Sequence, residues 1–260
     1  EIEAIAIGLI HSYANSMHEE KIAERLSAAR PDLSITLSSQ VCPEIREYER
    51  QSTACANAYV QPLMSRYLTK LDEALQSMGF MCPFLLMTSG GGLTTLDTSI
   101  KFPVRLVESG PAGGAILATE IAKECGIDNV LSFDMGGTTA KICLIDDYTP
   151  QMTRTFEVAR VYRNLKGSGL PLRIPAIEMV EIGAGGGSIA KVDDMKRISV
   201  GPESSGASPG PACYGQGGLD ATVTDADVIL GRIDPKDFAG GAVKLAPEKA
   251  DLAFQKAVGD

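Results

Sequence analysis

Alternating blocks of apolar and polar residues predict a chain in which strands and helices follow one another. Residues 2–10 form an almost continuous apolar run, which is typical of a strand buried on both faces of a parallel sheet. Residues 16–30 have helical spacing, with apolar side chains on one face, and Pro31 ends this segment. A short alternating segment, 33–37, follows. Together these segments predict a β-α-β unit.

A long amphipathic helix is predicted over residues 47–78. Pro62 lies inside it, where the missing N–H and the bulky ring predict a kink or a helix boundary. Gly79 marks its end. The apolar stripe, by which such a helix packs, recurs every four residues at Cys55, Tyr59, Leu63, Tyr67, Leu71 and Leu75.

Strands dominate the pattern from about residue 127, after a strand at 84–88 and a helix at 111–125. We therefore predict an α/β fold with a helix-rich part at 1–125, a strand-rich part at 126–245 and the start of a truncated helix at 246–260. The strands expected in the second part are 130–134, 141–146, 151–159, 176–182 and 188–192, and residues 201–218 are predicted to form a Gly/Pro/Ser loop. Glu1 opens on a strand-like run without an initiator Met, and Asp260 closes inside a predicted helix, so we expect a fragment of a longer protein.

Charge and cysteine content narrow the possible partners. The net charge is −9 and no run of Lys or Arg exists, which argues against nucleic acid and anionic membranes. An anion such as ATP must therefore be bound by local amides and individual cations. The six cysteines form no Cys-x-x-Cys pair and there are only two histidines, which argues against a zinc cluster. With no signal peptide or spanning segment, the cysteines are predicted to be buried thiols in a reducing cytoplasm.

The segment 134–139 (Asp-Met-Gly-Gly-Thr-Thr), between two predicted strands, is the strongest candidate for phosphate binding. Its glycines let the backbone turn tightly and bring amides close to a ligand, and its hydroxyls can donate to phosphate oxygens. The aspartate can hold a hydrated Mg²⁺, and a nearby lysine adds positive charge. A β-hairpin whose glycines only form the turn is the alternative. The candidate residues are Asp134, Gly136, Gly137, Thr138, Thr139 and Lys141.

Several motifs in a fixed order cover nearly all of the chain. Asp-x-Gly-Gly-Thr-Thr between two strands resembles the phosphate loop of the actin-like ATPase superfamily, and the whole set resembles the hydantoinase A/oxoprolinase family. The motifs are His11–Asn15, Pro43–Arg50, Ser109–Gly114, Phe133–Thr138, Ile182–Ala190, Val200–Ser205, Pro209–Gly215 and Thr222–Asp227. The resemblance implies an actin-like, ribonuclease-H-like ATPase fold from about residue 126.

The resemblance also implies a chemistry. Family members use ATP to activate a poorly electrophilic carbonyl in a hydantoin, in 5-oxoproline or in a ketone destined for carboxylation. Phosphorylating an amide oxygen gives an imidate-like species with a good leaving group, and water can then open the ring. ATP and Mg²⁺ are the implied cofactors, a cyclic amide or imide the implied substrate, and a hydantoinase B-type subunit or domain the implied companion. A small-molecule kinase, a ketone carboxylase subunit and a non-catalytic assembly module are the alternatives.

Two departures from the family pattern limit what is carried over. Relatives usually have an earlier Asp-x-Gly-Gly-Thr loop near their N-terminus, whereas this chain has only one such loop. We therefore expect the fragment alone to be inactive. Many relatives also have Asp where this chain has Lys141, so this lysine is expected to have another role, such as pairing with phosphate directly.

Two further glycine clusters are candidate phosphate contacts. The run 183–188 contains Gly185, Gly186 and Gly187, and it lacks the third glycine and the following helix of a dinucleotide fingerprint. It either approaches nucleotide or forms a structural hairpin. Gly110 and Gly113 lie at a predicted helix start, where free amides favour anions, or else they allow close packing on a sheet. A third cluster, 89–92, resembles glycine turns that contact adenosine in actin-like ATPases.

Outside the glycine loops, few residues are candidates for chemistry. His11 ends the first strand and is a candidate catalytic residue in a cleft, whereas His18 is predicted to be a solvated residue at a helix start. Cys213 has no nearby histidine to activate it and is predicted to be structural. Asp225 is predicted to be a helix N-cap, with metal or substrate binding as the alternative. The charged group at 46–50 is predicted to be a helix start or a substrate contact.

Overall fold

The computed structural model describes residues 2–162, 165 and 167–258, and it confirms the predicted α/β class of mixed sheets with flanking helices. Contacts divide the chain into two compact units: unit 1 comprises Glu1–Val130 and Ile145–Glu178, and unit 2 comprises Leu131–Leu144 and Met179–Asp260. This division differs from the predicted boundary because the segment 145–178 returns to unit 1. That 126–245 is a domain of its own stays a prediction.

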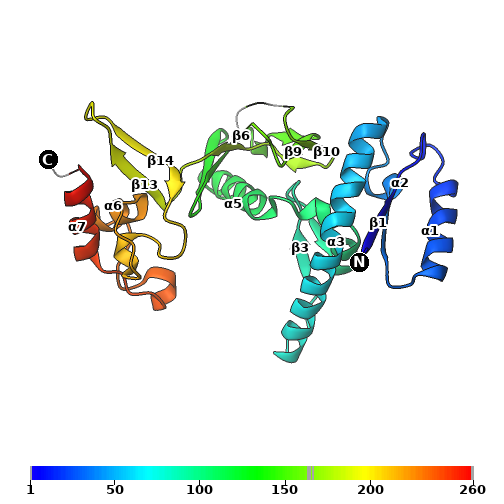
Figure 1. Cartoon of the computed structure of the whole chain (residues 1–260), viewed down its shortest axis with the longest axis horizontal. Coiled ribbons are helices and arrows are strands. Elements are labelled where there is room, and N and C mark those ends of the chain that lie inside the picture. Colours follow the sequence, from blue (N-terminus) through cyan, green and yellow to red (C-terminus); the bar gives the residue numbers. More distant parts are fainter. Residues whose placement is uncertain (1, 163–164, 166, 259–260) are drawn as a thin grey trace. The chain divides into compact units, whose positions relative to one another are not determined.

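Unit 1 begins with the predicted β-α-β unit (Figure 1). Strand β1 (Ala4–Ile7) pairs in parallel with β2 (Ser34–Leu37), and helix α1 (Met17–Ala29) connects them. The register aligns Ile7 with Leu37, and both side chains are buried. A short helix, α2 (Ser38–Val41), follows β2 directly.

The predicted long helix is α3 (Glu47–Ser77), which continues through Pro62 rather than ending there. Its C-terminus has the predicted glycine. Gly79 has a φ of +85°, its N–H donates to the Gln76 carbonyl, and the Phe80 N–H donates to the Leu75 carbonyl. These two bonds form a Schellman motif, which satisfies carbonyls at the end of the helix.

The predicted packing face of α3 is wrong. Tyr59, Leu63 and Tyr67 are 87%, 64% and 58% exposed. The buried face carries small and hydrogen-bonding residues, which allow the helix to approach β1 and β2 closely. Asn57, for example, is fully buried; its side-chain amide donates to Thr36 Oγ1 at 3.0 Å and to the Lys101 carbonyl at 3.1 Å. Burial of polar groups is tolerated here because they are hydrogen-bonded.

The rest of unit 1 consists of short strands and helices around a small core. Two of the predicted strands, 151–159 and 176–182, are each divided in two, because their halves pair with different partners. The buried core residues are Val41, Cys42, Ala54, Val104, Leu172 and Ile174. The elements are β3 (Leu85–Met87) paired with β4 (Leu93–Thr95), α4 (Leu96–Lys101), η1 (Pro103–Leu106), α5 (Ser109–Cys125), β7 (Thr149–Pro150), β8 (Met152–Thr153) paired with β11 (Ala176–Ile177), and β9 (Phe156–Val158) paired with β10 (Leu170–Leu172).

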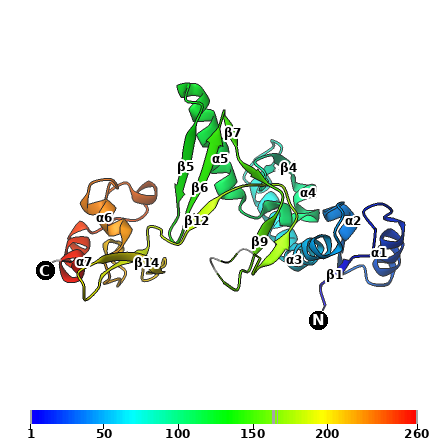
Figure 2. The same ribbon diagram turned by 90° about the horizontal axis from the view of Figure 1, so that it is seen from above.

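Unit 2 is built on two small sheets. Strands β5 (Val130–Met135), β6 (Ala140–Asp146) and β12 (Val180–Ile182) lie side by side in the order β12-β6-β5 (Figure 2). A second pair joins β13 (Ser188–Val192) to β14 (Ile198–Ser204), so the predicted loop at 201–218 is wrong in its first residues. The helical elements are η2 (Ala212–Tyr214), α6 (Val223–Ile229), η3 (Phe238–Gly241) and α7 (Pro247–Val258).

The cysteines are free thiols, and only half of them are buried. Cys42, Cys143 and Cys213 are buried as predicted, whereas Cys55, Cys82 and Cys125 are exposed. For Cys55 the reason is its place on the solvent-exposed stripe of α3. No helix among the described residues has the length and apolar character needed to cross a membrane.

Candidate functional site

The candidate phosphate loop, residues 136–139, connects β5 to β6 in unit 2. The Gly136 N–H donates to the Thr139 carbonyl at 2.9 Å, which closes the turn. Gly136, Gly137 and Thr138 are exposed. The N–H groups of Gly137, Thr138 and Thr139 donate to no group within the part of the chain that the structure describes. The loop therefore has three consecutive donors for an anion.

A second glycine loop, residues 183–187, packs against the first and fixes its orientation. The Gly186 N–H donates to the Gly136 carbonyl at 2.9 Å, and the Gly187 N–H donates to the Gly137 carbonyl at 2.7 Å. In a trans peptide the N–H points away from the preceding carbonyl. Because these two carbonyls face the second loop, the N–H groups of Gly137 and Thr138 point away from it.

The contact between the two loops is so close that it requires glycine. A Cβ at Gly185 would lie 2.7 Å from backbone atoms of Gly136, Gly137 and Thr138. A Cβ at Gly187 would lie 2.8 Å from Ser204 Oγ and 3.0 Å from the Gly137 carbonyl oxygen. The second loop therefore supports the first through its backbone, and its own contact with phosphate stays a prediction.

The start of α6 holds the second loop from its other side. The backbone N–H and the hydroxyl of Thr224 both donate to the Gly186 carbonyl at 2.8 Å, and the Ser205 N–H donates to the Gly187 carbonyl at 2.8 Å. The loop is therefore held on both sides by hydrogen bonds. Thr224 and Ser205 lie in the family motifs but were not among the site residues predicted from the sequence.

Asp225 organises this start of α6, although not as the predicted N-cap. Thr222 is the N-cap, and Asp225 occupies the third helical position of a capping box. The fully buried Asp225 carboxylate also accepts from the N–H groups of Ala212 and Cys213, at 3.2 and 2.7 Å. Burial, together with the hydrogen bond to Asp225, raises the pKa of the Cys213 thiol to about 12. A thiol with so high a pKa is a poor nucleophile, which supports the predicted structural role of this cysteine.

Asp134 and Lys141 flank the phosphate loop on β5 and β6. The Asp134 side chain is exposed and makes no hydrogen bond or ion pair with any described residue. Lys141 Nζ donates to Thr139 Oγ1 at 3.2 Å and pairs with Glu181 Oε1 at 2.8 Å, across the register of β6 and β12. The lysine charge is therefore shared with Glu181, and its contact orients the Thr139 hydroxyl.

The donor set fits a hydrated Mg²⁺ shared with phosphate better than an ion held by protein alone. Among the residues that the structure describes, no group of three or more His, Cys, Asp or Glu side chains can hold a metal ion. Mg²⁺ commonly binds through one or two carboxylates together with water and phosphate oxygens. Asp134, with its exposed carboxylate beside the loop, has the chemistry for that role.

The other predicted site residues, His11, Gly110 and Gly113, lie in unit 1. His11 is exposed with a φ of +56°, and its N–H donates to Glu47 Oε1 at 3.3 Å. A Cβ would meet no atom within 4 Å at Gly110 and only Met87 at 3.9 Å at Gly113. Close packing therefore does not explain these two glycines.

The glycine turn at 89–92 packs on α5, and its contact with adenosine stays a prediction. Gly91 has a φ of +80°, and a Cβ there would lie 2.7 Å from Ile116 Cδ1, so this turn needs glycine to pack on α5. His18 is exposed near the start of α1, as predicted.

A buried polar network in unit 1 was missed from the sequence. Glu19 is fully buried and accepts from Leu9 N–H, Ser38 Oγ and both the N–H and Oγ of Ser39, at 2.7–3.0 Å. Burial raises the pKa of this carboxyl, but the hydrogen bonds from Ser39, Ser12 and Leu9 outweigh it and lower the pKa below its usual value.

Arg50 belongs to the same network. It is fully buried, and it donates to Ser38 Oγ and to the carbonyls of Glu44 and Leu9. Its guanidinium therefore joins the segment after β1 to α2 and α3. This arrangement favours the predicted helix-start role of the group 46–50 over substrate contact.

Comparison with known proteins identifies a family and several similar proteins. Residues 50–260 match the family model described as Hydantoinase/oxoprolinase. The chain is 36% identical to the caprolactamase subunit alpha of Pseudomonas jessenii over 100% of this chain and 36% of that protein. It is 32% identical to the acetophenone carboxylase gamma subunit of Aromatoleum aromaticum over 98% of this chain and 34% of that protein.

Solved structures agree with these relatives. The nucleotide-free structure of acetone carboxylase, described as catalysing ATP-dependent acetone carboxylation, matches with a TM-score of 0.73 and 27% identity over 99% of this chain and 36% of that one. The ATP-dependent caprolactamase from Pseudomonas jessenii matches with a TM-score of 0.72 and 35% identity over 97% and 35%. Both likenesses are consistent with the predicted actin-like ATPase fold. The chain thus spans little more than a third of the length of these relatives.

Proposed function

The chain belongs to the hydantoinase/oxoprolinase family, and we propose that it supplies a phosphate-binding half-site to an ATP-dependent enzyme that activates a cyclic amide for ring opening. The observation that carries the proposal is the set of three consecutive N–H groups, at Gly137, Thr138 and Thr139, that donate to no described residue. Such groups of backbone donors form anion-binding concavities. Two relatives are described as ATP-dependent enzymes, which supports a nucleoside triphosphate as the anion.

The loop residues would bind and orient the phosphates rather than carry out covalent chemistry. Phosphoryl transfer depends mainly on positioning and on stabilising charge, and rigid donors do this without reorganising. The bonds from Gly186 and Gly187 provide that rigidity. The hydroxyls of Thr138 and Thr139 would donate to phosphate oxygens.

Mg²⁺, held by Asp134, would neutralise phosphate charge. Lys141 is already paired with Glu181, so its proposed role is to orient Thr139 and to moderate the negative charge near the loop. His11, Gly110 and Gly113 lie in unit 1, and their roles stay predictions from the sequence.

The proposed reaction transfers the γ-phosphoryl group of ATP to the carbonyl oxygen of the cyclic amide. ADP leaves, the ring nitrogen gives up its proton, and the amide becomes an imidate ester of phosphate. Water then adds to the imidate carbon, and the ring C–N bond breaks to give a free amine and an acyl phosphate. A second water hydrolyses the acyl phosphate to a carboxylate and inorganic phosphate. The products are the ring-opened amino acid or acylamino acid, ADP and inorganic phosphate.

The whole enzyme is proposed to need a companion subunit or domain of the hydantoinase B type. Relatives of the chain are named as subunits: caprolactamase subunit alpha, acetophenone carboxylase gamma subunit and the acetone carboxylase beta subunit of Xanthobacter autotrophicus. The carboxylase relatives also favour a second candidate, in which the activated carbonyl belongs to a ketone that is then carboxylated.

Phosphate release from ATP tests the proposal. The intact protein with its companion would be assayed with caprolactam, 5-oxoproline and hydantoin, and separately with acetone or acetophenone plus bicarbonate. We expect a cyclic amide to stimulate release, and Asp134→Asn to abolish it. Asp194→Asn is the matched control, because Asp194 is another exposed carboxylate of unit 2 in the turn between β13 and β14.

The outcomes of this assay distinguish the candidate functions. Stimulation by a ketone and bicarbonate alone would favour the carboxylase candidate. No stimulation by any of these substrates, or equal activity in Asp134→Asn and the control, would contradict the proposal.

A further inference from the structure

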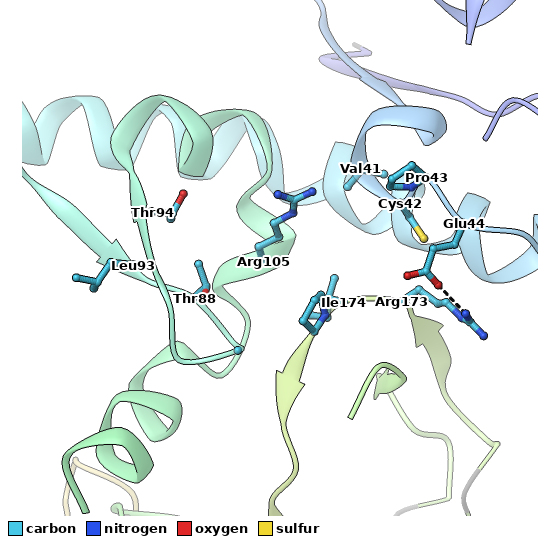
Figure 3. A pocket seen from close by; sticks show the side chains of 12 residues that line it. Val41, Cys42, Pro43, Glu44, Thr88, Leu93, Thr94, Arg105, Arg173 and Ile174 are labelled. Atoms are coloured by element: carbon cyan, nitrogen blue, oxygen red, sulfur yellow. Dashed lines mark hydrogen bonds and ion pairs between the residues drawn. The ribbon is translucent and has the colours of Figure 1, made fainter. Parts of the chain in front are cut away.

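A cavity in unit 1 has no role in the proposed phosphate site. It has a volume of about 440 Å³, within the range of pockets for small molecules. Its walls come from α2 and the residues after it, the β3–β4 hairpin, η1 and the segment after β10 (Figure 3). Apolar lining is provided by Val41, Leu93 and Ile174.

Two arginines and one glutamate give the cavity a net positive charge. Arg173 Nη1 pairs with Glu44 Oε2 at 2.6 Å, so these two charges offset each other. Arg105 is different: its guanidinium lies 4.7 Å from the Phe102 ring centroid and makes no ion pair with any described residue. Figure 3 shows Arg105 pointing toward Val41 and Pro43, whereas Arg173 turns toward Glu44.

Two further features of the lining favour an anionic ligand that accepts hydrogen bonds. Arg173 Nε is buried and has no hydrogen-bond partner among the described residues, which is costly for a charged group unless a ligand supplies an acceptor. Cys42 also lines the cavity, and burial raises the pKa of its thiol, so it remains protonated and adds no negative charge.

We propose that this cavity binds a small organic monocarboxylate, with the carboxylate on Arg105 and a short apolar body against Val41 and Ile174. Guanidinium and carboxylate form the strongest class of hydrogen-bonded ion pair. The single excess positive charge suits a monoanion better than a phosphate dianion. The apolar walls distinguish the ligand from an inorganic anion. This site goes beyond the proposed function, since it needs neither ATP nor the phosphate loop.

Isothermal titration of the intact protein with pentanoate tests the site. Pentanamide is the neutral probe of nearly the same shape, and inorganic phosphate is the probe without an apolar body. We expect pentanoate to bind with a Kd on the order of millimolar or tighter. Pentanamide and phosphate should each bind at least about tenfold more weakly.

Substitutions of Arg105 test whether this side chain binds the carboxylate. Arg105→Met keeps the aliphatic stem on Phe102 and should weaken pentanoate at least about tenfold, while Arg105→Lys should fall between Met and wild type because it keeps charge but not the planar fork. Arg30→Met removes an exposed arginine from another part of unit 1 and should leave affinity unchanged. Circular dichroism checks the fold, and Arg105→Lys decides the matter if the Met variant unfolds.

Three results of these titrations would contradict the proposed monocarboxylate site. The proposal is wrong if pentanoate does not bind, if pentanamide or phosphate binds as tightly, or if folded Arg105→Met or Arg105→Lys binds with wild-type affinity. Failure here would not affect the proposed function, because the phosphate-release assay uses residues of the other unit.

Discussion

Replacing Gly185 with alanine adds a methyl group where the two glycine loops leave no room for one. Its Cβ would lie 2.7 Å from Gly136 O, Gly137 C and Thr138 N. These are backbone atoms, which cannot turn aside as the end of a flexible side chain would. The phosphate loop and the second loop must therefore move apart, and the hydrogen bonds between them must lengthen.

The losses of stability and of ATP affinity follow from this overlap. Overpacking of a tightly packed region costs about 1–3 kcal/mol. At about 2–4 °C per kcal/mol for a domain of about this size, Gly185→Ala should lower Tm by about 2–12 °C. Because the same shift turns the Gly137 and Thr138 N–H groups, ATP affinity should fall at least about tenfold.

The assay compares alanine variants of Gly185 and Gly137, which lie on opposite sides of the contact between the loops. Gly137→Ala is the control for stability, since a Cβ there would meet no atom within 4 Å. Its free energy of unfolding should change by less than about 0.5 kcal/mol. Thermal and urea unfolding of both variants give the stabilities, and titration with Mg-ATP gives the affinities. If Gly185→Ala matched wild type in both Tm and ATP affinity, the inferred contact between the loops would be refuted.

Three further predictions concern groups around this contact and in unit 1. Thr224→Val removes the hydroxyl bond to the Gly186 carbonyl and should destabilise by about 0.5–1.5 kcal/mol in urea unfolding; no change would show that this bond is unimportant. Glu19 has a folded pKa below its usual 4.5, so its stabilisation is present above that pH and is lost as pH falls through the folded pKa. Glu19→Gln should therefore make the urea midpoint less dependent on pH as the pH falls below the usual Glu pKa, and an unchanged pH dependence would contradict the shift. Cys213, with a pKa of about 12, should resist iodoacetamide in the native protein while exposed Cys55 reacts; mass spectrometry after labelling at pH 8 detects either outcome.

Features that depend on sequence neighbours can be predicted from this chain. The run at 2–10 and the glycine at 79 predict β1 and the Schellman end of α3, because apolar runs and positive φ act locally. The segment 134–139 likewise predicts a turn between two strands. A Thr-x-x-Asp signature at 222–225 is also local, and it could have identified Thr222 as the N-cap.

Features that join distant segments could not be predicted in this way. The second glycine loop meets the first about 50 residues away along the chain, and no periodicity encodes that contact. The buried face of α3 carries Asn57 and Arg50, whereas hydrophobic patterning assumes that buried positions are apolar. Glu19 is buried where Ser38 and Ser39 of α2 donate to its carboxylate, an arrangement that only the fold creates.

Backbone NMR of the intact protein, labelled with ¹⁵N at Gly and Thr, tests the central claim most directly. On titration with Mg-ATP, the N–H signals of Gly137, Thr138 and Thr139 should shift to saturation. Those of Gly186 and Gly187 should shift much less, because they already donate to the loop carbonyls. If the three loop signals stayed in place while ATP bound, the nucleotide phosphates would lie elsewhere and the proposed phosphate site would be wrong.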